Sequence, residues 1–382
     1  AGKRRGMMHN RKGSFWQSLF RTRDRFSLQE LSYLHEVLDR HPVIQEGNKE
    51  VVVEALRSIA ELMIWGDQHD PSFFDFFAER QTLSYFHRIL SQPQSRTGEV
   101  AVQVLQTLSI LIQNIRSEQA IYFLFSNNHI NAIVSRGLDM TNDEILAYYV
   151  SFLKAIAMKL NRETIQFFFT LSKAERQFPL YTHAVKYFKH EESMVRAAVR
   201  TLTLQVFAVE DAEVREFVVA GPPAGYFPDL GGHMAEQCRS LEGISAATGV
   251  GSIDPSRIGA ALDDIDDLMY YCNDVAQVGA GDENPIAGAL RSGLWDTFGC
   301  GLVRGLLPAL RYAAYPRDLA LQAPNKPSEG YVSVLCSLHL LERVFRQVEI
   351  KQLLDALASA LVLPGGGARG RAALGPGKGL AE

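Results

Sequence analysis

LKAI, at Leu153–Ile156, is the third of five short sequence words that share the pattern apolar, polar, small, apolar. The others are LRSI (Leu56–Ile59), LQTL (Leu105–Leu108), VRTL (Val199–Leu202) and LCSL (Leu335–Leu338). Successive words begin 49, 48, 46 and 136 residues apart, and the last interval is about three of the others. A small residue between two apolar ones lets neighbouring helices approach closely, so this spacing predicts stacked helical repeats. The alternative is chance, because any amphipathic helix yields such words.

Helical spacing dominates the remaining sequence, and strand-like alternation is scarce. Ser27, with Glu30 three residues later, predicts a capping box at the first helix. Helices are predicted at 27–40, 47–65, 70–79, 81–92, 97–116, 117–126, 141–160, 162–171, 180–189, 191–208, 254–278, 285–312, 329–347 and 349–362. The predicted fold class is therefore all-α, an armadillo/HEAT-like helical solenoid with disordered termini.

Composition sets limits on the organisation of the chain. The chain has 382 residues, 47% of them hydrophobic, which is too apolar for intrinsic disorder and longer than one compact core usually allows. No apolar run reaches the ~18–20 residues of a membrane span. Segment 221–251 is rich in Gly and Pro and is predicted to be a loop or boundary, and residues 364–382 a disordered Gly-rich tail.

Charge is distributed unevenly along the chain. The formal net charge is −4, yet five cations lie in the first fourteen residues, a predicted basic disordered arm: Lys3, Arg4, Arg5, Arg11 and Lys12. A basic arm on an acidic body favours an anionic membrane surface or an acidic partner, and argues against nucleic-acid binding. The alternative is a solvated tail without a partner.

The residue patterns typical of active sites are missing from the sequence. The four cysteines are about thirty or more residues apart, which excludes the paired ligands of ribbon, finger or RING zinc sites and fits reduced, buried thiols. The acidic cluster Asp263, Asp264, Asp266 and Asp267 is interpreted as a solvated helix face, with cation binding as the alternative. No phosphate loop, GxSxG or HExxH motif occurs. We therefore predict no catalytic residue, no metal and no cofactor.

One segment near the amino end has the character of an interfacial anchor. The candidate membrane or partner contacts are Phe15, Trp16, Leu19, Phe20, Arg21, Arg23 and Arg25. Four bulky apolar side chains fall on one helical face and arginines follow at once, which suits rings at the headgroup level beside anionic lipid. The alternative is an end helix that caps the first repeat.

Six stretches resemble the FPL-domain family. They are RDRFSLQEL (Arg23–Leu31), IWGDQHDPSFFDFF (Ile64–Phe77), LQTLSILIQNI (Leu105–Ile115), YFLFSNNHINAI (Tyr122–Ile133), EILAYYVSFLKAIAMKLNRETIQFFF (Glu144–Phe169) and FPLYTHAVKYFKHEESMVRAAVRTLTLQV (Phe178–Val206). This family includes animal endosomal-maturation proteins, C-type lectin domain family 16 member A-like proteins and plant Golgi-associated relatives. The candidate family-motif residues are Trp65, Gly66, Asp67, Gln68, Phe74, Asp75, Phe76, Phe77, Phe178, Pro179 and Leu180.

The resemblance implies an FPL-type armadillo-like domain at 15–220, and the helical spacing predicts continuing helical repeats at 252–363. It also implies a cytoplasmic protein, peripheral on endosomal, lysosomal or Golgi membranes, that acts as a non-catalytic scaffold in trafficking and autophagy, including mitophagy. The partners implied are trafficking GTPase machinery and ubiquitin ligase components. The alternative is a component of an E3 ubiquitin ligase, or a non-RING ligase, that acts with partner ligases.

Overall fold

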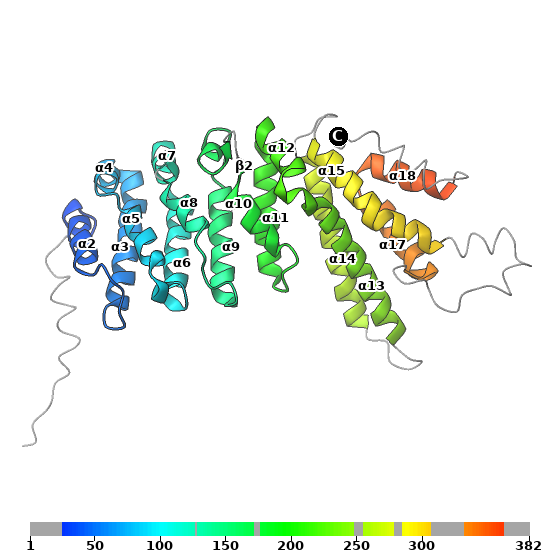
Figure 1. The fold of residues 1–382 in the computed structure, drawn as a ribbon, viewed down its shortest axis with the longest axis horizontal. Helices are drawn as coiled ribbons and strands as arrows, with labels where there is room; N and C mark the ends of the chain where they lie inside the picture. The colour runs from blue at the N-terminus through cyan, green and yellow to red at the C-terminus, as the bar shows by residue number, and fades with distance from the viewer. Residues whose placement is uncertain are drawn as a thin grey trace, which may run out of the picture. The chain divides into compact units, whose positions relative to one another are not determined.

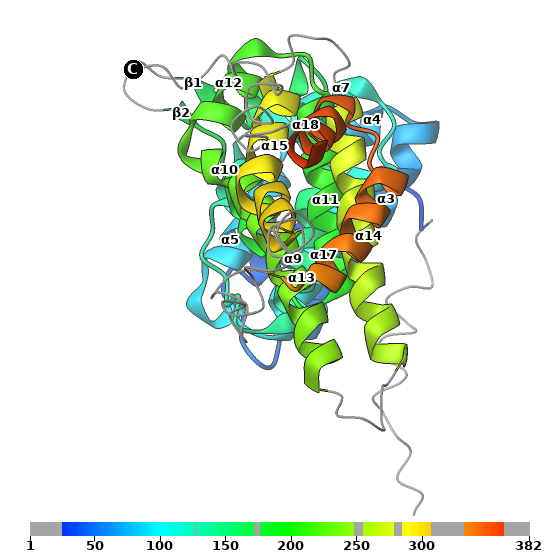
Figure 2. The same ribbon diagram turned by 90° about the vertical axis from the view of Figure 1, so that its right-hand side faces the viewer.

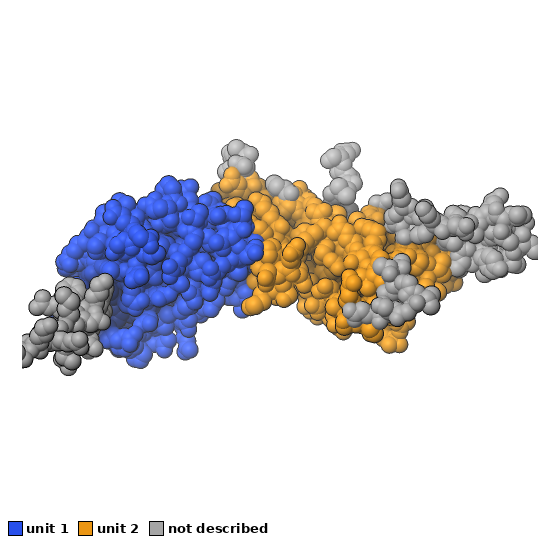
Figure 3. Space-filling view, turned by 90° about the horizontal axis from the view of Figure 1, so that it is seen from below, with its two compact units in different colours: residues 1–159 blue, residues 160–382 orange. Residues whose placement is uncertain are grey.

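The structure is a computed structural model that describes residues 25–126, 128–171, 176–247, 255–278, 285–306 and 332–362. The chain divides into two compact units, residues 1–159 and 160–382 (Figure 3). The described residues are almost entirely helical, which confirms the all-α prediction (Figure 1). The predicted basic arm and Gly-rich tail lie outside the described residues.

Unit 1 is a stack of helices of the armadillo kind. Its elements are α2 (Leu28–Arg40), α3 (Lys49–His69), α4 (Ser72–Glu79), α5 (Leu83–Ser91), η1 (Pro93–Ser95), α6 (Glu99–Asn114), α7 (Glu118–Ser126), α8 (His129–Val134) and α9 (Asp143–Ala157). The helices α2, α3, α6 and α9 pack in succession, side by side (Figure 1). The predicted cap is present, since Ser27 Oγ accepts the Glu30 N–H at 3.2 Å.

The repeated words form the seams of this stack. In α3, α6 and α9 both apolar positions of each word are at most 1% exposed: Leu56, Ile59, Leu105, Leu108, Leu153 and Ile156. Side-chain hydrogen bonds cross the layers at nearly the same interval as the words. His35 reaches Thr82, Ile44 reaches Gln92, and Asp67 reaches Arg116, which are 47, 48 and 49 residues apart. The sequence period therefore corresponds to the distance between stacked layers.

Unit 2 begins with short elements and continues with long helices. Its elements are η2 (Thr164–Phe167), β1 (Thr170–Leu171), β2 (Arg176–Gln177), α10 (Pro179–Ala184), η3 (Val185–Tyr187), α11 (Ser193–Ala208), α12 (Ala212–Ala220), η4 (Pro222–Gly225), α13 (Tyr226–Ala247), α14 (Pro255–Gln277), α15 (Pro285–Leu294), the π-helical turn η5 (Trp295–Gly299), α17 (Val334–Gln347) and α18 (Lys351–Val362). Strands β1 and β2 pair antiparallel, with Thr170 opposite Gln177. Helix α13 packs on α14 and α15, and α14 packs on α17 (Figure 2).

The Gly/Pro-rich segment 221–251 is not a loop over most of its length, because residues 226–247 form the long helix α13. Its glycines allow close helix crossing. A Cβ on Gly231 would lie 2.9 Å from the Gly293 carbonyl oxygen of α15, and a Cβ on Gly293 would lie 2.8 Å from the Phe227 carbonyl. The prediction failed because glycine serves both turns and close backbone contacts. The predicted domain limits around this segment stay predictions.

Three shorter predictions also need correction. The helix predicted at 162–171 is a 3₁₀ turn followed by β1, and Phe169 packs edge-on against Phe178 and Phe217 instead of continuing a helical face. Helix α3 does not end at 65 but runs to His69. Helices α8 and α12 lie where no helix was predicted.

The fifth word, LCSL, was assigned to the wrong face of its helix. Leu335 is 78% exposed and Leu338 53%, whereas Ser337 and Leu340 are fully buried. Ser337 is selected for the interior because its small side chain lies against helical residue Gly305, where a Cβ would approach the Ser337 Oγ to 2.2 Å. The match of this word to the others is therefore chance, as the alternative reading allowed.

Candidate protein-docking surface

The candidate amino-terminal anchor is placed only at its last residue. Phe15, Trp16, Leu19, Phe20, Arg21 and Arg23 lie outside the described residues, so their contacts stay a prediction. The Arg25 guanidinium forms an ion pair with the Glu61 carboxylate of α3 and lies 5.6 Å from the centroid of the Phe26 ring. Arg25 is thus held at the surface of unit 1.

Trp65 is the centre of a stacked aromatic column at the end of α3. Its ring stacks on Phe26 with the centroids 5.3 Å apart and on His69 at 4.7 Å, and it meets Phe73 edge-on. Phe26, at the outer end of the column, is 37% exposed. Offset stacking holds such rings firmly, so the column gives this surface a rigid aromatic edge.

Two of the next three motif residues join α3 to its neighbours. A Cβ on Gly66 would lie 2.5 Å from Phe73 Cβ, so glycine permits the close approach of α4. The Asp67 carboxylate accepts the N–H groups of Arg116, at 2.8 Å, and Ser117, at 3.2 Å, just before α7 begins. An anion at a helix amino terminus satisfies backbone donors that the helix leaves unpaired. Gln68 is exposed.

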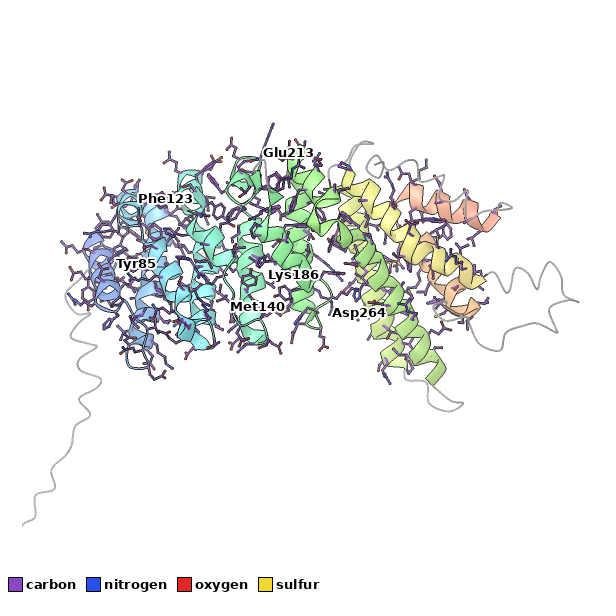
Figure 4. The ribbon with its side chains drawn as sticks, in the orientation of Figure 1. Tyr85, Phe123, Met140, Lys186, Glu213 and Asp264 are labelled. Carbon is purple, nitrogen blue, oxygen red and sulfur yellow. The ribbon has the colours of Figure 1, made fainter. Side chains whose placement is uncertain are left out.

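The aromatic residues of α4 contact other rings of unit 1; Phe73 and Phe77 are buried, and Phe74 and Phe76 are half-buried. Phe77 is fully buried, Phe74 meets Phe123 edge-on at 5.3 Å (Phe123 is labelled in Figure 4), and Phe76 meets the His35 ring at 5.3 Å. Asp75 is exposed. Core packing therefore accounts for these rings without a partner.

The tripeptide Phe178-Pro179-Leu180 belongs to the core of unit 2. Phe178 is 1% exposed and packs against Phe169, Tyr181 and Phe217. Pro179 is the first residue of α10, where a missing N–H costs nothing. Leu180 is fully buried. The family-motif residues of the two units thus serve mainly to hold the fold, and each set acts within its own unit.

The surface that sequence reasoning missed runs along α3. One pocket of about 230 Å³ lies between α3 and α6 and is lined by Lys49, Glu50, Val53, Glu54, Arg57, Glu99, Val100 and Gln103. A second, of about 340 Å³, lies between α2 and α3 and is lined by Arg25, Phe26, Glu30, Glu54, Ser58, Glu61 and Leu62. We call these lining residues the α3 face. Its signal in the sequence is the helical spacing of Glu50, Glu54 and Glu61, which by itself is typical of any solvated face.

Two of the four aspartates in the acidic cluster of α14 form ion pairs with neighbouring helices. Asp264 (labelled in Figure 4) lies 3.2 Å from Arg196 of α11, and Asp266 pairs with Arg343 of α17. Within the described part of the chain, no group of three or more His, Cys, Asp or Glu side chains is arranged to hold a metal ion. The cluster thus positions α14 between two neighbours.

Three of the four thiols are poor nucleophiles. Burial raises the pKa of Cys238 to about 12 and that of Cys272 to about 12. The pKa of Cys336 is also raised by burial. Because their pKa values are raised, these cysteines stay protonated near neutral pH. They are therefore weak nucleophiles, since the thiolate is the reactive form.

Among the residues that the structure describes, every helix is too short or too polar to span a membrane.

The structure therefore defines a mostly helical repeat protein that packs most of its motif aromatics inside its units and exposes charged groups on the α3 face. The FPL family profile, described as an uncharacterised conserved protein, matches residues 56–207. Residues 56–207 therefore form a domain of the FPL family.

Curated relatives extend the similarity over most of the chain. Protein TRANSPARENT TESTA 9 of Arabidopsis thaliana is 41% identical over 91% of this chain and 40% of its own length. Protein CLEC16A of Homo sapiens is 35% identical over 89% of this chain and 31% of its own length. The Drosophila melanogaster CLEC16A homolog is 38% identical over 70% of this chain and 25% of its own length. The chain thus spans well under half of the length of these relatives.

Two solved structures align with this chain at low similarity. A designed armadillo repeat protein in complex with the peptide (KR)4 aligns with a TM-score of 0.39 and 14% identity, covering 70% of this chain and 98% of that one. An engineered protein aligns with a TM-score of 0.43 and 14% identity, covering 82% of this chain and 97% of that one.

Proposed function

We propose that the protein is a non-catalytic helical scaffold that docks other proteins during endosomal and lysosomal membrane trafficking and autophagy, including mitophagy. Its place is peripheral, on endosomal, lysosomal or Golgi membranes. The observation that carries the proposal is the FPL domain at residues 56–207, together with similarity to TRANSPARENT TESTA 9 and CLEC16A over most of the chain. The chain covers less than half of the length of each of these relatives. Any activity of the full-length relatives therefore comes to this chain only as part of the proposal.

The chemistry of the described residues supports a docking role. The side chains available on the α3 face are carboxylates, guanidinium groups and an aromatic ring, which recognise partners by charge and stacking. Stacked repeats present such groups on a rigid frame, since each layer is held by its neighbours. Partners of the predicted kinds are trafficking GTPase machinery and ubiquitin ligase components.

Removal and replacement of the protein in cells tests this proposal. We expect loss of the chain to delay endosome maturation and to reduce autophagic flux, and the unchanged chain to restore both. Leu153→Asp, which buries a charge in the α9 seam, should fail to restore them, whereas Leu335→Asp, at an exposed site in α17, should restore them. Normal endosomes and normal flux in cells without the protein would contradict the scaffold role.

The second candidate, a non-RING E3 ubiquitin ligase or a component of one, is separated by reconstitution. A ligase would build ubiquitin chains when the purified chain is mixed with E1, E2 and ubiquitin. Activity that persists after replacement of all four cysteines would remove a thioester route, consistent with the raised pKa of Cys238 and Cys272. Activity only in the presence of a second ligase would assign the chain a component role.

A further inference from the structure

We propose that the α3 face of unit 1 binds an extended basic peptide of a partner protein, with one lysine or arginine side chain in each of its two pockets. The inference rests on the proposed scaffold role for its use in the cell. The charge, size and spacing of the two pockets that flank α3 support it. The helices α2, α3 and α6 that form these pockets lie side by side in unit 1 (Figure 1).

The charge of the α3 face favours a cationic occupant. Five glutamates line the two pockets, against three cations. Each cation already has a carboxylate partner, since Arg25 pairs with Glu61, Arg57 with Glu54 at 3.6 Å, and Lys49 with Glu46 at 2.6 Å. The carboxylates of Glu30 and Glu50 form no ion pair with a described residue. These two groups leave net negative charge for a partner to neutralise.

The local field already affects a cation of this chain. The pKa of Lys49 is raised, first by the hydrogen bond to the Glu46 carboxylate and then by the charges of Glu46, Glu99 and Glu50. A raised lysine pKa means that the surroundings favour the protonated form. A partner lysine in the same pocket would meet carboxylates from both α3 and α6.

The size of the pockets favours single side chains. Small-molecule sites usually enclose ~300–1,000 Å³, and the two pockets, at about 230 and 340 Å³, lie at or below the lower end of that range. The larger pocket has Phe26 at its edge, and Arg25 already places its guanidinium over that ring. A partner cation in this pocket would have Glu30 and Glu54 as counter-charges.

The spacing of the pockets predicts the spacing of the cations. The α3 residues of the two pockets are centred about six positions apart, which is ~9 Å along the helix axis. The pockets flank α3 on its α6 side and its α2 side and share Glu54, so across the helix axis they are at most about one interhelical distance apart, ~9 Å. Their separation is therefore at most ~13 Å, and four residues of an extended chain, at ~3.3 Å each, reach that distance with both side chains on one face. The expected pattern is a cation, three other residues and a second cation.

Fluorescence anisotropy with labelled peptides and the purified full chain tests the inference. Peptide GSKGSGKSG has lysines four positions apart, GSKKGSGSG has the same composition with adjacent lysines, and GSQGSGQSG has no charge. We expect the first peptide to bind at least fivefold more tightly than the second at 50 mM salt, and the third not to bind. Equal binding of the first two would overturn the proposed spacing.

Paired variants locate the site. Glu54→Gln with Glu61→Gln, two exposed positions on the α3 face, should weaken the first peptide at least fivefold. Glu79→Gln with Glu118→Gln removes the same charge from exposed positions on α4 and α7 and should change binding less than twofold. Equal losses of peptide affinity in both variants would show that the peptide is held by non-specific charge attraction and not by the α3 face. Concentration-dependent self-association that the peptide reverses would assign the face to a second copy of the chain.

The cellular assay separates this inference from the scaffold proposal. If the α3-face variant loses the peptide yet restores endosome maturation, the scaffold role stands and the α3 face is not its docking site. If the peptide binds as expected but cells without the protein are normal, the trafficking proposal fails and the binding surface stands.

Discussion

The helices of unit 1 and the later helices of unit 2 meet through different kinds of contact. In unit 1, α3, α6 and α9 share aliphatic seams, with Leu56, Leu105 and Leu153 at most 1% exposed. In unit 2, α13 and α15 approach at Gly231 and Gly293 until their backbones touch. Side-chain seams leave a periodic apolar signature in the sequence, whereas backbone contacts leave glycines that resemble a loop. The difference explains why one unit was easier to predict than the other.

The same comparison holds for buried polar groups. Unit 1 encloses His35, whose Nε2 lies 2.9 Å from Thr82 Oγ1. Unit 2 encloses a chain of hydroxyl groups in which Tyr271 lies 2.7 Å from both Thr203 Oγ1 and Tyr226 OH. Burial lowers the pKa of His35 to about 4 and raises the pKa of Tyr226 to about 12. Lowering the pH should therefore destabilise unit 1 through protonation of His35, whereas the hydroxyl groups of unit 2 keep their protonation state.

The largest effect is expected from replacing the first leucine in two of the repeated motifs, LKAI and LCSL. Leu153→Asp should destabilise the protein by about 4–5 kcal/mol or more, because an unpaired carboxylate would be enclosed in the α9 seam. Leu335→Asp, at a position 78% exposed, should change stability by less than about 0.5 kcal/mol. Thermal unfolding followed by circular dichroism measures both. Similar melting of the two variants would remove the distinction between the words.

A pair of glycine variants tests the backbone contact in unit 2. Gly293→Ala should cost about 2–3 kcal/mol, because the new Cβ would lie 2.8 Å from the carbonyl group of Phe227. Gly232→Ala, with nothing within 4 Å, should stabilise α13 by about 0.5–1 kcal/mol. Urea unfolding gives both values. If Gly293→Ala is neutral, α13 and α15 are not in close contact.

Acid should weaken unit 1 through His35. The folded pKa, about 4, lies below the unfolded value of 6.5, so the unfolded state binds the proton first and stability is lost as pH falls from 6.5 towards 4. About 2 kcal/mol should be lost between pH 7 and pH 5, and His35→Gln should remove this part of the slope. Urea unfolding at several pH values checks it. An unchanged slope in the variant would assign the effect to another group.

The smallest effect concerns the bond between layers of unit 1. Asp67→Ala should cost about 1 kcal/mol, because the N–H groups of Arg116 and Ser117 lose their acceptor at the start of α7. Gln68→Ala, at the next and exposed position, should be neutral. Hydrogen exchange at Arg116 and Ser117 should accelerate only in the first variant. Unaltered exchange in Asp67→Ala would show that water replaces the carboxylate fully.

Some residues of the candidate surface could be found from sequence and others could not. Trp65, Asp67 and the phenylalanines of α4 were identified by resemblance, which marks residues without saying that most of them hold the fold. Glu54 and Glu61 were not identified from sequence, because charged residues at helical spacing occur on the solvent-exposed face of most surface helices. Their separation into two pockets depends on α2 and α6, which no local pattern specifies.

The sequence by itself determined the helical class, the layer interval in α3, α6 and α9, and the start of α2 at Ser27, because these follow from contacts repeated at short range along the chain. Only the tertiary structure decided that 226–247 is a helix, that Leu335 faces outward while Ser337 faces inward, and that the glutamates of α3 line two pockets. Each of these depends on which backbone lies opposite, and residues far apart in the chain supply it.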